Sequence, residues 1–393
     1  MCTLRRSRVL VAGGVLAGAV GGLGSVAEAA VVVQCVPPVA GAAVVSGGAA
    51  PGACASGATK VSLPASAADQ ATLNSVLPYL SFSSTGVGGQ PTIKISNANV
   101  QIVSGSGSTS GSVNGKGNLV IGYDETPGSQ TGSHNLMLGS GQTFSSYGSI
   151  IGGSNNRSTA PHSAVFGFRN TVSGAHATVT GGLFNTAAGL YSSISGGRLG
   201  TSSAYSSISG GFANKTTAAY SSITGGCTNL TTASTVATAG DHSFCMSNGA
   251  FQTISGGYRN TATANSAWIG GGNKNLATGS DSAISGGISN TASGPHSSVS
   301  GGADNLAADD SSSVSGGWDN MTTGEYGSIS GGGLNIASGG YSSISGGRRN
   351  SAAGYGGSVG GGDGNTASGL FASVLGGYNQ TVTGAQATYP AGP

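Results

Sequence analysis

Histidine is the side chain whose ordinary pKa lies closest to neutral, and the chain has five histidines. Four of them occupy one position of a repeated pattern, three residues before an apolar residue that we expect to be buried. Tyr or Phe fills that position in other repeats, as at Tyr326, Tyr341 and Phe371. Metal ligands must converge on one point, but residues at a fixed offset are spread along the molecule, so we predict a turn-packing column and no metal site. The four histidines are His134, His162, His176 and His296.

A second chemical signature is GGSVG at 356–360, which matches the Gly-x-Ser-x-Gly pattern of hydrolase nucleophiles. Ser358 stands at the repeat position that serine also holds in neighbouring repeats, and no strand–elbow–helix pattern surrounds it. The single GGDGN at 361–365 is not repeated as a calcium-binding nonapeptide would be. His242, beside Asp241 in an irregular stretch, has no predicted role. These residues predict no catalysis and no cofactor.

Apart from His242 and its neighbour Asp241, these side chains are positioned by a repeat. A Gly-Gly step begins at 286, 301, 316, 331, 346, 361 and 376, a spacing of fifteen residues. Related steps begin upstream at 152, 167, 181, 196, 210, 225 and 256. With 75 Gly among 393 residues and 7% charged residues, the composition does not fit an ordinary globular core. A strict period of this length predicts a solenoid.

The repeat has conserved columns within the chain itself. Ile or Val lies two residues before Gly-Gly, between small polar residues, which is the pattern of a short half-buried strand. Asn lies four residues after the first Gly, and Ala usually follows two residues later. We predict an all-β parallel β-solenoid or β-roll of about fifteen-residue coils, with stacked Asn amides hydrogen-bonded as a ladder. The predicted ladder residues are Asn260, Asn275, Asn290, Asn305, Asn320, Asn335, Asn350 and Asn365.

The N-terminus has the organisation of a secretory signal peptide. Arg5, Arg6 and Arg8 precede an apolar run from 9 to 26, and the Ala-Glu-Ala at 27–29 is a small-residue cleavage signal. The alternative is an uncleaved membrane anchor, and no later segment is long and apolar enough to span a bilayer. We predict a signal peptide over 1–29, no membrane span after cleavage, and a secreted or cell-surface protein.

The charge and cysteine content of the mature chain narrow the function further. Removing three Arg and one Glu leaves 11 of 14 basic residues and 11 of 12 acidic residues, so the mature chain is formally neutral. No basic patch and no aromatic–basic interleaving is visible along the sequence, so nucleic-acid binding is not expected. Four cysteines remain in two sequence-local pairs, which in an exported chain favours disulfides Cys35–Cys54 and Cys227–Cys245 over a metal site.

The coil SSVSGGADNLAA at 297–308 and its companions resemble the head repeat of YadA-like trimeric autotransporter adhesins. The segment at 114–153 also resembles the lead-in of bacterial exported proteins that carry such heads. The resemblance covers about residues 114–388 and implies a left-handed β-roll, three chains side by side, and attachment to host or matrix proteins. The chain departs from the family in its period of fifteen, in Asn for Ser in the second strand, and in having no stalk or barrel anchor.

The segments that precede and follow the repeats have their own sequence patterns. Residues 30–68 are rich in Ala, Gly and Pro, and no fold is predicted for them. At 69–80, Leu73, Val76, Leu77 and Leu80 lie on one helical face until Pro78 disturbs the pattern, which predicts a short capping helix or a trimer nucleus. We expect the strand pattern at 91–104 to start a β-roll head over 91–388, followed by a tail at 389–393.

These observations predict a structural or adhesive surface protein that binds host, matrix or neighbouring-cell surfaces by avidity. Each coil offers one Ile or Val and one Ala to its interior, roughly 2–4 kcal/mol before entropy, so further burial is expected from a homotrimer. The candidate contacts follow Gly-Gly and are Tyr258, Trp318, Arg348 and Tyr378.

Two other function classes compete with adhesion. Ice or crystal-face binding is the alternative, since Ser pairs such as Ser298/Ser300 and Ser343/Ser345 flank the inward residue. That array is similar to the one in fifteen-residue β-helical antifreeze proteins, although those use Thr. A β-helical polysaccharide lyase or hydrolase would need aromatic and carboxylate groupings that the chain lacks.

Overall fold

The structure of the chain is a computed structural model, and it describes residues 32–36, 59–63, 72, 74–232 and 251–390. The chain divides into two compact units, Met1–Val100 and Gln101–Pro393. Within the described residues, no helix has the length and apolar character needed to cross a membrane.

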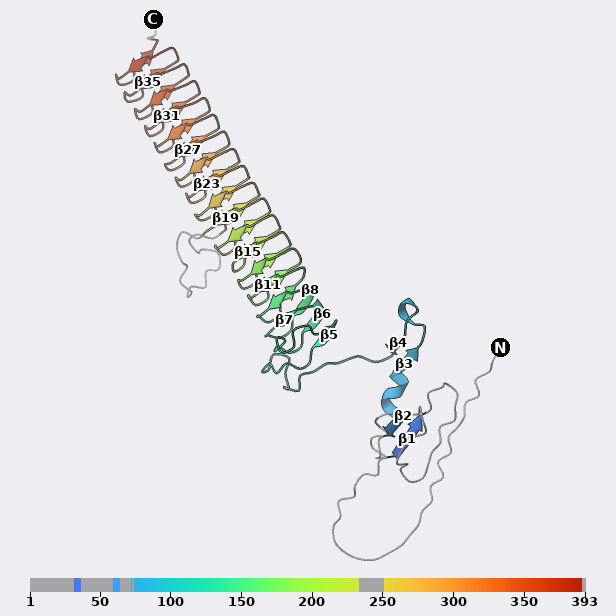
Figure 1. The fold of residues 1–393 in the computed structure, drawn as a ribbon. Helices are drawn as coiled ribbons and strands as arrows, with labels where there is room; N and C mark the ends of the chain where they lie inside the picture. Colours follow the sequence, from blue (N-terminus) through green and yellow to red (C-terminus); the bar gives the residue numbers. More distant parts are fainter. Residues whose placement is uncertain (1–31, 37–58, 64–71, 73, 233–250, 391–393) are drawn as a thin grey trace, which may run out of the picture. The chain divides into compact units, whose positions relative to one another are not determined.

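The second unit is a parallel β-solenoid whose coils stack into a rod (Figure 1). Each regular coil contributes one two-residue strand to each of two sheets, and each strand pairs in parallel with the equivalent strand one coil away, as Ile284 pairs with Val299. The predicted all-β solenoid of about fifteen-residue coils is confirmed; its left-handed twist stays an expectation.

The strands of the first sheet carry the Ile/Val column. They are β5 (Leu119–Ile121), β6 (Leu136–Ser140), β8 (Ile150–Ser154), β10 (Ala164–Val165), β12 (Thr178–Val179), β14 (Ser193–Ile194), β16 (Ser207–Ile208), β18 (Ser222–Ile223), β20 (Thr253–Ile254), β22 (Trp268–Ile269), β24 (Ala283–Ile284), β26 (Ser298–Val299), β28 (Ser313–Val314), β30 (Ser328–Ile329), β32 (Ser343–Ile344), β34 (Ser358–Val359), β36 (Ser373–Val374) and β38 (Thr388–Tyr389).

The second sheet follows the Gly-Gly turn and the Asn column, and it contains 16 strands among the described residues. They are β7 (Thr143–Phe144), β9 (Arg157–Ser158), β11 (Thr171–Val172), β13 (Thr186–Ala187), β15 (Thr201–Ser202), β17 (Lys215–Thr216), β19 (Leu230–Thr231), β21 (Thr261–Ala262), β23 (Leu276–Ala277), β25 (Thr291–Ala292), β27 (Leu306–Ala307), β29 (Met321–Thr322), β31 (Ile336–Ala337), β33 (Ser351–Ala352), β35 (Thr366–Ala367) and β37 (Thr381–Val382).

The core is a narrow channel filled by aligned side chains. Every Ile, Val or Met of the first-sheet column from Met137 to Val374 is no more than 1% exposed. The second sheet contributes mostly Ala, and where it contributes a hydroxyl, that hydroxyl is paired inside the core: Thr231 Oγ1 lies 2.8 Å from Ser221 Oγ. Most strands pair a half-buried residue with a buried one, as Ala283 and Ile284 do, which is the period-two pattern expected from the sequence.

The first unit contains two antiparallel pairs. β1 (Val32–Val36) pairs with β2 (Thr59–Leu63), and β3 (Leu80–Ser83) pairs with β4 (Thr92–Ile95), with η2 (Val87–Gly89) between β3 and β4. The β1–β2 pair lies in the segment for which no fold was predicted.

The helix expected over 69–80 ends before Leu80. The described residues 72 and 74–76 are helical and are followed by η1 (Leu77–Tyr79). Leu80 belongs to β3 and pairs with Ile95, so it does not share a helical face with Leu77. Pro78 has no N–H to continue a helix, and the chain becomes extended at Leu80.

The prediction that the roll begins at 91 is wrong. The strand at Thr92–Ile95 pairs with the preceding β3, and the first strand of the parallel stack is β5. An alternating pattern predicts a strand but does not determine its partner. The nearby Gly-rich turn closes a short loop, which costs less entropy than pairing with a distant coil.

Candidate functional site

The turn between the two sheets of each coil is built on the Gly-Gly step. In the coil at 286–290, Gly287 has φ of 90°, and a Cβ at this position would collide with the carbonyl oxygen of Gly302 in the next coil. Gly286 has no such restriction, because a Cβ there would meet open space. The second glycine is therefore required by both backbone conformation and close approach between coils.

A buried Asn holds this turn to its neighbours. Asn290 is 0% exposed. Its Nδ2 donates to the carbonyl oxygen of Gly286 in its own coil at 2.9 Å and to that of Gly302 in the next coil at 3.1 Å. Its Oδ1 accepts the backbone N–H of Asn305 at 3.0 Å. Each amide thus binds three backbone groups, of which the carbonyl of Gly302 also accepts the N–H of Ile288.

These amides form a ladder along the rod. The pattern recurs at every predicted ladder residue from Asn260 to Asn365 and ends where Gln380 donates its N–H to Asn365. Most of its bonds join a side chain to backbone, and direct amide–amide bonds occur at pairs such as Asn335–Asn320, at 3.0 Å. Gly200 takes the place of Asn in one coil, where its N–H still donates to Asn185.

The two residues between Gly-Gly and Asn point outward and define what we call the Gly-Gly edge. The first of the two forms a parallel bridge to the equivalent residue of the next coil, as in Ile288–Ala303–Trp318. The second has positive φ, for example 56° at Ser289. Because the buried Asn and the glycines fix the backbone, these two positions are free to vary from coil to coil.

All four predicted contact residues lie in the bridged position of this edge. Tyr258, Trp318 and Tyr378 are 39%, 51% and 68% exposed, and Arg348 is also exposed. The structure aligns them on one edge but does not bring them into contact with one another. Any ligand that touches all four must therefore extend along the rod.

The Gly-Gly edge also contains a combination that the sequence search missed. Arg169 lies 5.1 Å from the ring centroid of Phe168 and 5.5 Å from that of Phe184. Arg198 lies 5.6 Å from Phe212, and Arg259 lies 4.9 Å from Tyr258. The expectation of no aromatic–basic interleaving is therefore wrong for the folded chain. The missed signal was the recurrence of Arg at the two positions after Gly-Gly, with Arg198 at the first position and Arg259 at the second.

The opposite turn of each coil carries the histidine and tyrosine column. Its residues also have positive φ, such as 54° at His162 and 57° at Tyr341. Six successive ring pairs lie 4.9–5.6 Å apart between centroids, joining Tyr147, His162, His176, Tyr191, Tyr205, Tyr220 and Phe251. A second ring stack contains Tyr326 and Tyr341, and it continues through edge-to-face contacts to Tyr355 and Phe371.

His134 serves a different purpose at the start of the roll. Its Nδ1 lies 3.2 Å from the carbonyl oxygen of Thr109, so it donates there. Its Nε2 is 3.0 Å from the backbone nitrogen of Ser104 and accepts that N–H. Both ring nitrogens are thus used to hold the 104–109 segment beside the first coils.

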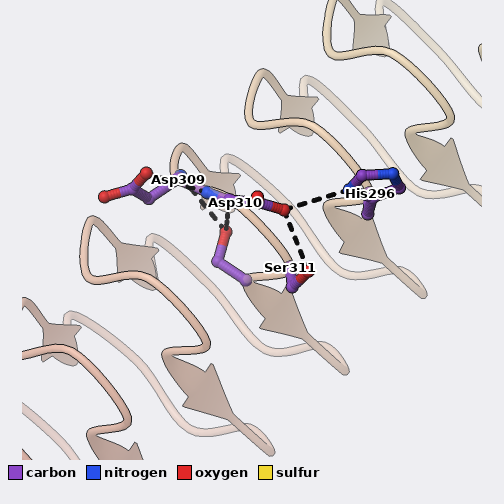
Figure 2. A network of polar contacts seen from close by, with 5 residues as sticks. His296, Asp309, Asp310 and Ser311 are labelled. Atoms are coloured by element: carbon purple, nitrogen blue, oxygen red, sulfur yellow. Dashed lines mark hydrogen bonds and ion pairs between the residues drawn. The ribbon is translucent and has the colours of Figure 1, made fainter.

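His296 lies between the two ring stacks and forms the one ion pair found among the described residues (Figure 2). Its Nδ1 is 3.0 Å from Asp310 Oδ1, which also accepts a hydrogen bond from Ser311 at 2.9 Å. The hydrogen bond to Asp310 raises the pKa of His296 above its ordinary 6.5. The same bond, with that from Ser311, lowers the pKa of Asp310 below 3.8. Both side chains are exposed, so the pair is a surface contact.

The remaining predicted residues give no site. Ser358 donates to Ser373 Oγ at 3.0 Å on the outside of the first sheet. Cys227 occupies the bridged position of the Gly-Gly edge and is a free thiol in the structure. Cys54, His242 and Cys245 lie outside the described residues, as does the side chain of Cys35, so both disulfides stay predictions. In the part of the chain that is described, no three His, Cys, Asp or Glu side chains cluster as metal ligands.

No protein-family model matches the chain, and no curated protein matches it significantly.

Proposed function

We propose that this chain is an exported structural and adhesive protein that binds an extracellular protein or glycan surface through the Gly-Gly edge, without catalysis. The observation that carries this proposal is the division of each coil into a repeated interior and two variable outward positions. The coil repeat that creates this division also resembles the head repeat of YadA-like adhesins. A secreted or cell-surface location follows from the signal peptide pattern.

Avidity is the proposed source of affinity. Tyr258, Trp318, Arg348 and Tyr378 are exposed on one edge but are separated by several coils. Each offers a weak contact, and linked weak contacts can together exceed single affinities by about 10²–10⁴. The rod holds the contacts at fixed spacing, so little entropy is lost when several engage at once.

The test uses the mature protein immobilised on a surface and measures retention of cells and matrix components. Single changes of Tyr258, Trp318, Arg348 or Tyr378 to Ser should lower retention by less than about threefold, and the quadruple variant should lower it by at least about tenfold. The matched control changes four exposed serines of the first sheet to Ala. One single change that abolishes retention would replace the avidity model with a local site. The control serines are Ser255, Ser300, Ser315 and Ser345.

We also propose that the protein is a homotrimer. The outward positions of the second sheet carry no charged residue between 251 and 383 among the described residues, and they include Leu276, Leu306, Met321 and Ile336. Burial of this row between chains would add apolar area that a narrow coil interior does not supply. Light scattering of the mature protein should give three times the chain mass, and a stable monomer would rule the trimer out.

Ice or crystal-face binding is the second candidate, and the outer face of the second sheet favours it. Thr261 and Thr263 flank the buried Ala262, and threonine recurs at outward positions of other strands, as at Thr278 and Thr291. This face provides methyl and hydroxyl groups at the regular spacing of the coils, about 4.8 Å. Strong thermal hysteresis in freezing solution, without retention of cells or matrix, would favour this function over adhesion.

A further inference from the structure

The charges of the solenoid are divided along its length. Residues 126–232 and 251–280 contain six basic residues and no Asp or Glu, whereas residues 281–363 contain seven acidic residues and two arginines. The formal neutrality of the mature chain therefore conceals a basic half and an acidic half. The charges are divided along the rod because each coil of about fifteen residues adds one step to its length, so residues far apart in the sequence lie far apart on the rod.

The basic half has most of its charge on the Gly-Gly edge. Four of its six basic residues lie there, and all four are exposed. None has a carboxylate partner, since the ion pair of the described residues is the His296–Asp310 contact. We call these four cations and the aromatic residues between them the basic stripe. It consists of Phe168, Arg169, Phe184, Arg198, Phe212, Tyr258, Arg259 and Lys274.

The rings of the basic stripe are available to a ligand. Phe168, Phe184, Phe212 and Tyr258 are 37–41% exposed. Three arginines lie over these rings, so each guanidinium is held close to an aromatic surface while its exposed N–H groups can still donate. A ligand along the stripe would meet apolar ring surface and hydrogen-bond donors in alternation.

We propose that the basic stripe binds a linear acidic polysaccharide lying along the rod, an inference that rests on the proposed adhesive function and names its ligand class. Six coil steps separate Arg169 from Lys274, a distance of about 29 Å that holds four cations. The mean spacing between cations is therefore about 10 Å, whereas each strand of duplex DNA presents one phosphate about every 3.4 Å. Such sparse cations leave most phosphates of a nucleic acid unpaired.

The chemistry of a uronate polymer matches the stripe more closely. Its carboxylates are separated by sugar rings, whose C–H faces pack on aromatic side chains and whose hydroxyls accept hydrogen bonds from Arg and Lys. The edge is a straight array with no deep pocket, which suits a polymer bound at many weak points. Binding would be electrostatic in part and therefore sensitive to salt.

The experiment measures binding of the full mature chain to sodium hyaluronate, neutral dextran and a thirty-nucleotide oligothymidine at low salt. We expect hyaluronate to bind, dextran to fail, and oligothymidine to bind at least about tenfold more weakly than hyaluronate. Binding of hyaluronate should be lost at about 1 M salt, where the Debye length is about 3 Å.

Two double variants with the same charge change locate the site. Arg169→Ser with Arg259→Ser should weaken hyaluronate binding by roughly tenfold, as expected for two exposed charge contacts. Ser already occupies the equivalent backbone position at Ser289 with φ of 56°, so the change should leave the coil folded. Arg157→Ser with Lys215→Ser, on the second sheet, is the control and should leave binding unchanged.

Four outcomes would overturn the inference. Equal loss in both double variants would show that only net charge matters. Tighter binding of oligothymidine would assign the stripe to nucleic acid, and salt-dependent self-association without hyaluronate binding would assign it to the acidic half of a second copy. Retention of cells that persists without hyaluronate binding would reject this ligand but leave the adhesive function standing. Hyaluronate binding without retention of cells would support this ligand but reject the adhesive function.

Discussion

The two edges of each coil have a similar backbone turn, but different side chains stabilise them. Both contain one outward residue with positive φ, as at Ser289 on the Gly-Gly edge and at His296 on the opposite edge. On the Gly-Gly edge a buried amide such as that of Asn290 binds three backbone groups. On the opposite edge, outward rings stack on their neighbours, as Tyr205 does on Tyr220 at 4.9 Å. On the Gly-Gly edge the stabilising group is a buried amide, so the exposed residues of that edge are available for a ligand. On the opposite edge the exposed rings themselves provide the contacts between coils.

The largest expected effect comes from the two adjacent glycines of one turn. Gly287→Ala should destabilise the protein by about 4 kcal/mol, because the new Cβ is strained by positive φ and meets the backbone of the next coil. Gly286→Ala should be neutral or stabilising by about 0.5 kcal/mol, since its Cβ meets open space. Chemical denaturation of both variants checks the pair. Equal effects would mean that the turn is not constrained as described.

The amide ladder gives the next largest effect. Asn290→Ala should cost about 2–3 kcal/mol, because it leaves the carbonyl of Gly286 and the N–H of Asn305 without their partner and removes one of the two donors to the carbonyl of Gly302. Ser285→Ala, on the exposed face of the same coil, should stay within about 0.5 kcal/mol of the parent.

The gap in the ladder allows the reverse experiment. Gly200→Asn supplies the missing amide, and we expect a gain of about 1 kcal/mol in the free energy of unfolding. A Cβ at Gly200 would lie 3.1 Å from Asn185 Oδ1, which leaves limited room. A loss of stability in this variant would show that the coil around Gly200 has adapted to the absence of the amide.

Ring stacking on the opposite edge should matter less. Tyr205→Ser places in the column a residue that it already holds at Ser266 and Ser311 with the same φ of 54°. The loss then reports the stack alone, and about 1 kcal/mol is expected. Thermal melting provides the measurement, with Ser266→Tyr as the inverse variant that should extend the stack from Phe251. If Tyr205→Ser costs more than Asn290→Ala, the two edges have been ranked in the wrong order.

The smallest effect is the pH dependence of the His296–Asp310 pair. The folded pKa of His296 is raised, so its contribution to stability is present below pH 6.5 and is lost as the pH rises through the folded value. The folded pKa of Asp310 is lowered, so its contribution is lost as the pH falls through that value, below 3.8. NMR titration of His296 should shift to lower pH in Asp310→Asn. An unchanged titration would mean that the pair does not form in solution.

Much of the fold could be predicted because it is local and repeated. The Ile/Val column, the Asn column and the second glycine each have a fixed offset, and each offset corresponds to one place in the coil, as Ile284, Gly287 and Asn290 show. The non-repeating part was predicted less well. The strand at Thr92–Ile95 was recognised, but its antiparallel partner was not. The four candidate contact residues share one edge, as their common offset predicted, but their relation to the cations was missed.

The sequence by itself determined the coil, because the hydrophobic period, the turn glycines and the buried amide all specify the same fifteen-residue unit. Only the tertiary structure decided which distant residues become neighbours. Arg169 and Phe184 are fifteen positions apart but lie one coil apart, with the guanidinium 5.5 Å from the ring. Parallel stacking places equivalent residues at the spacing of adjacent strands, about 4.8 Å. That conversion of sequence distance into contact creates the ring stacks, the basic stripe and the separation of charge along the rod.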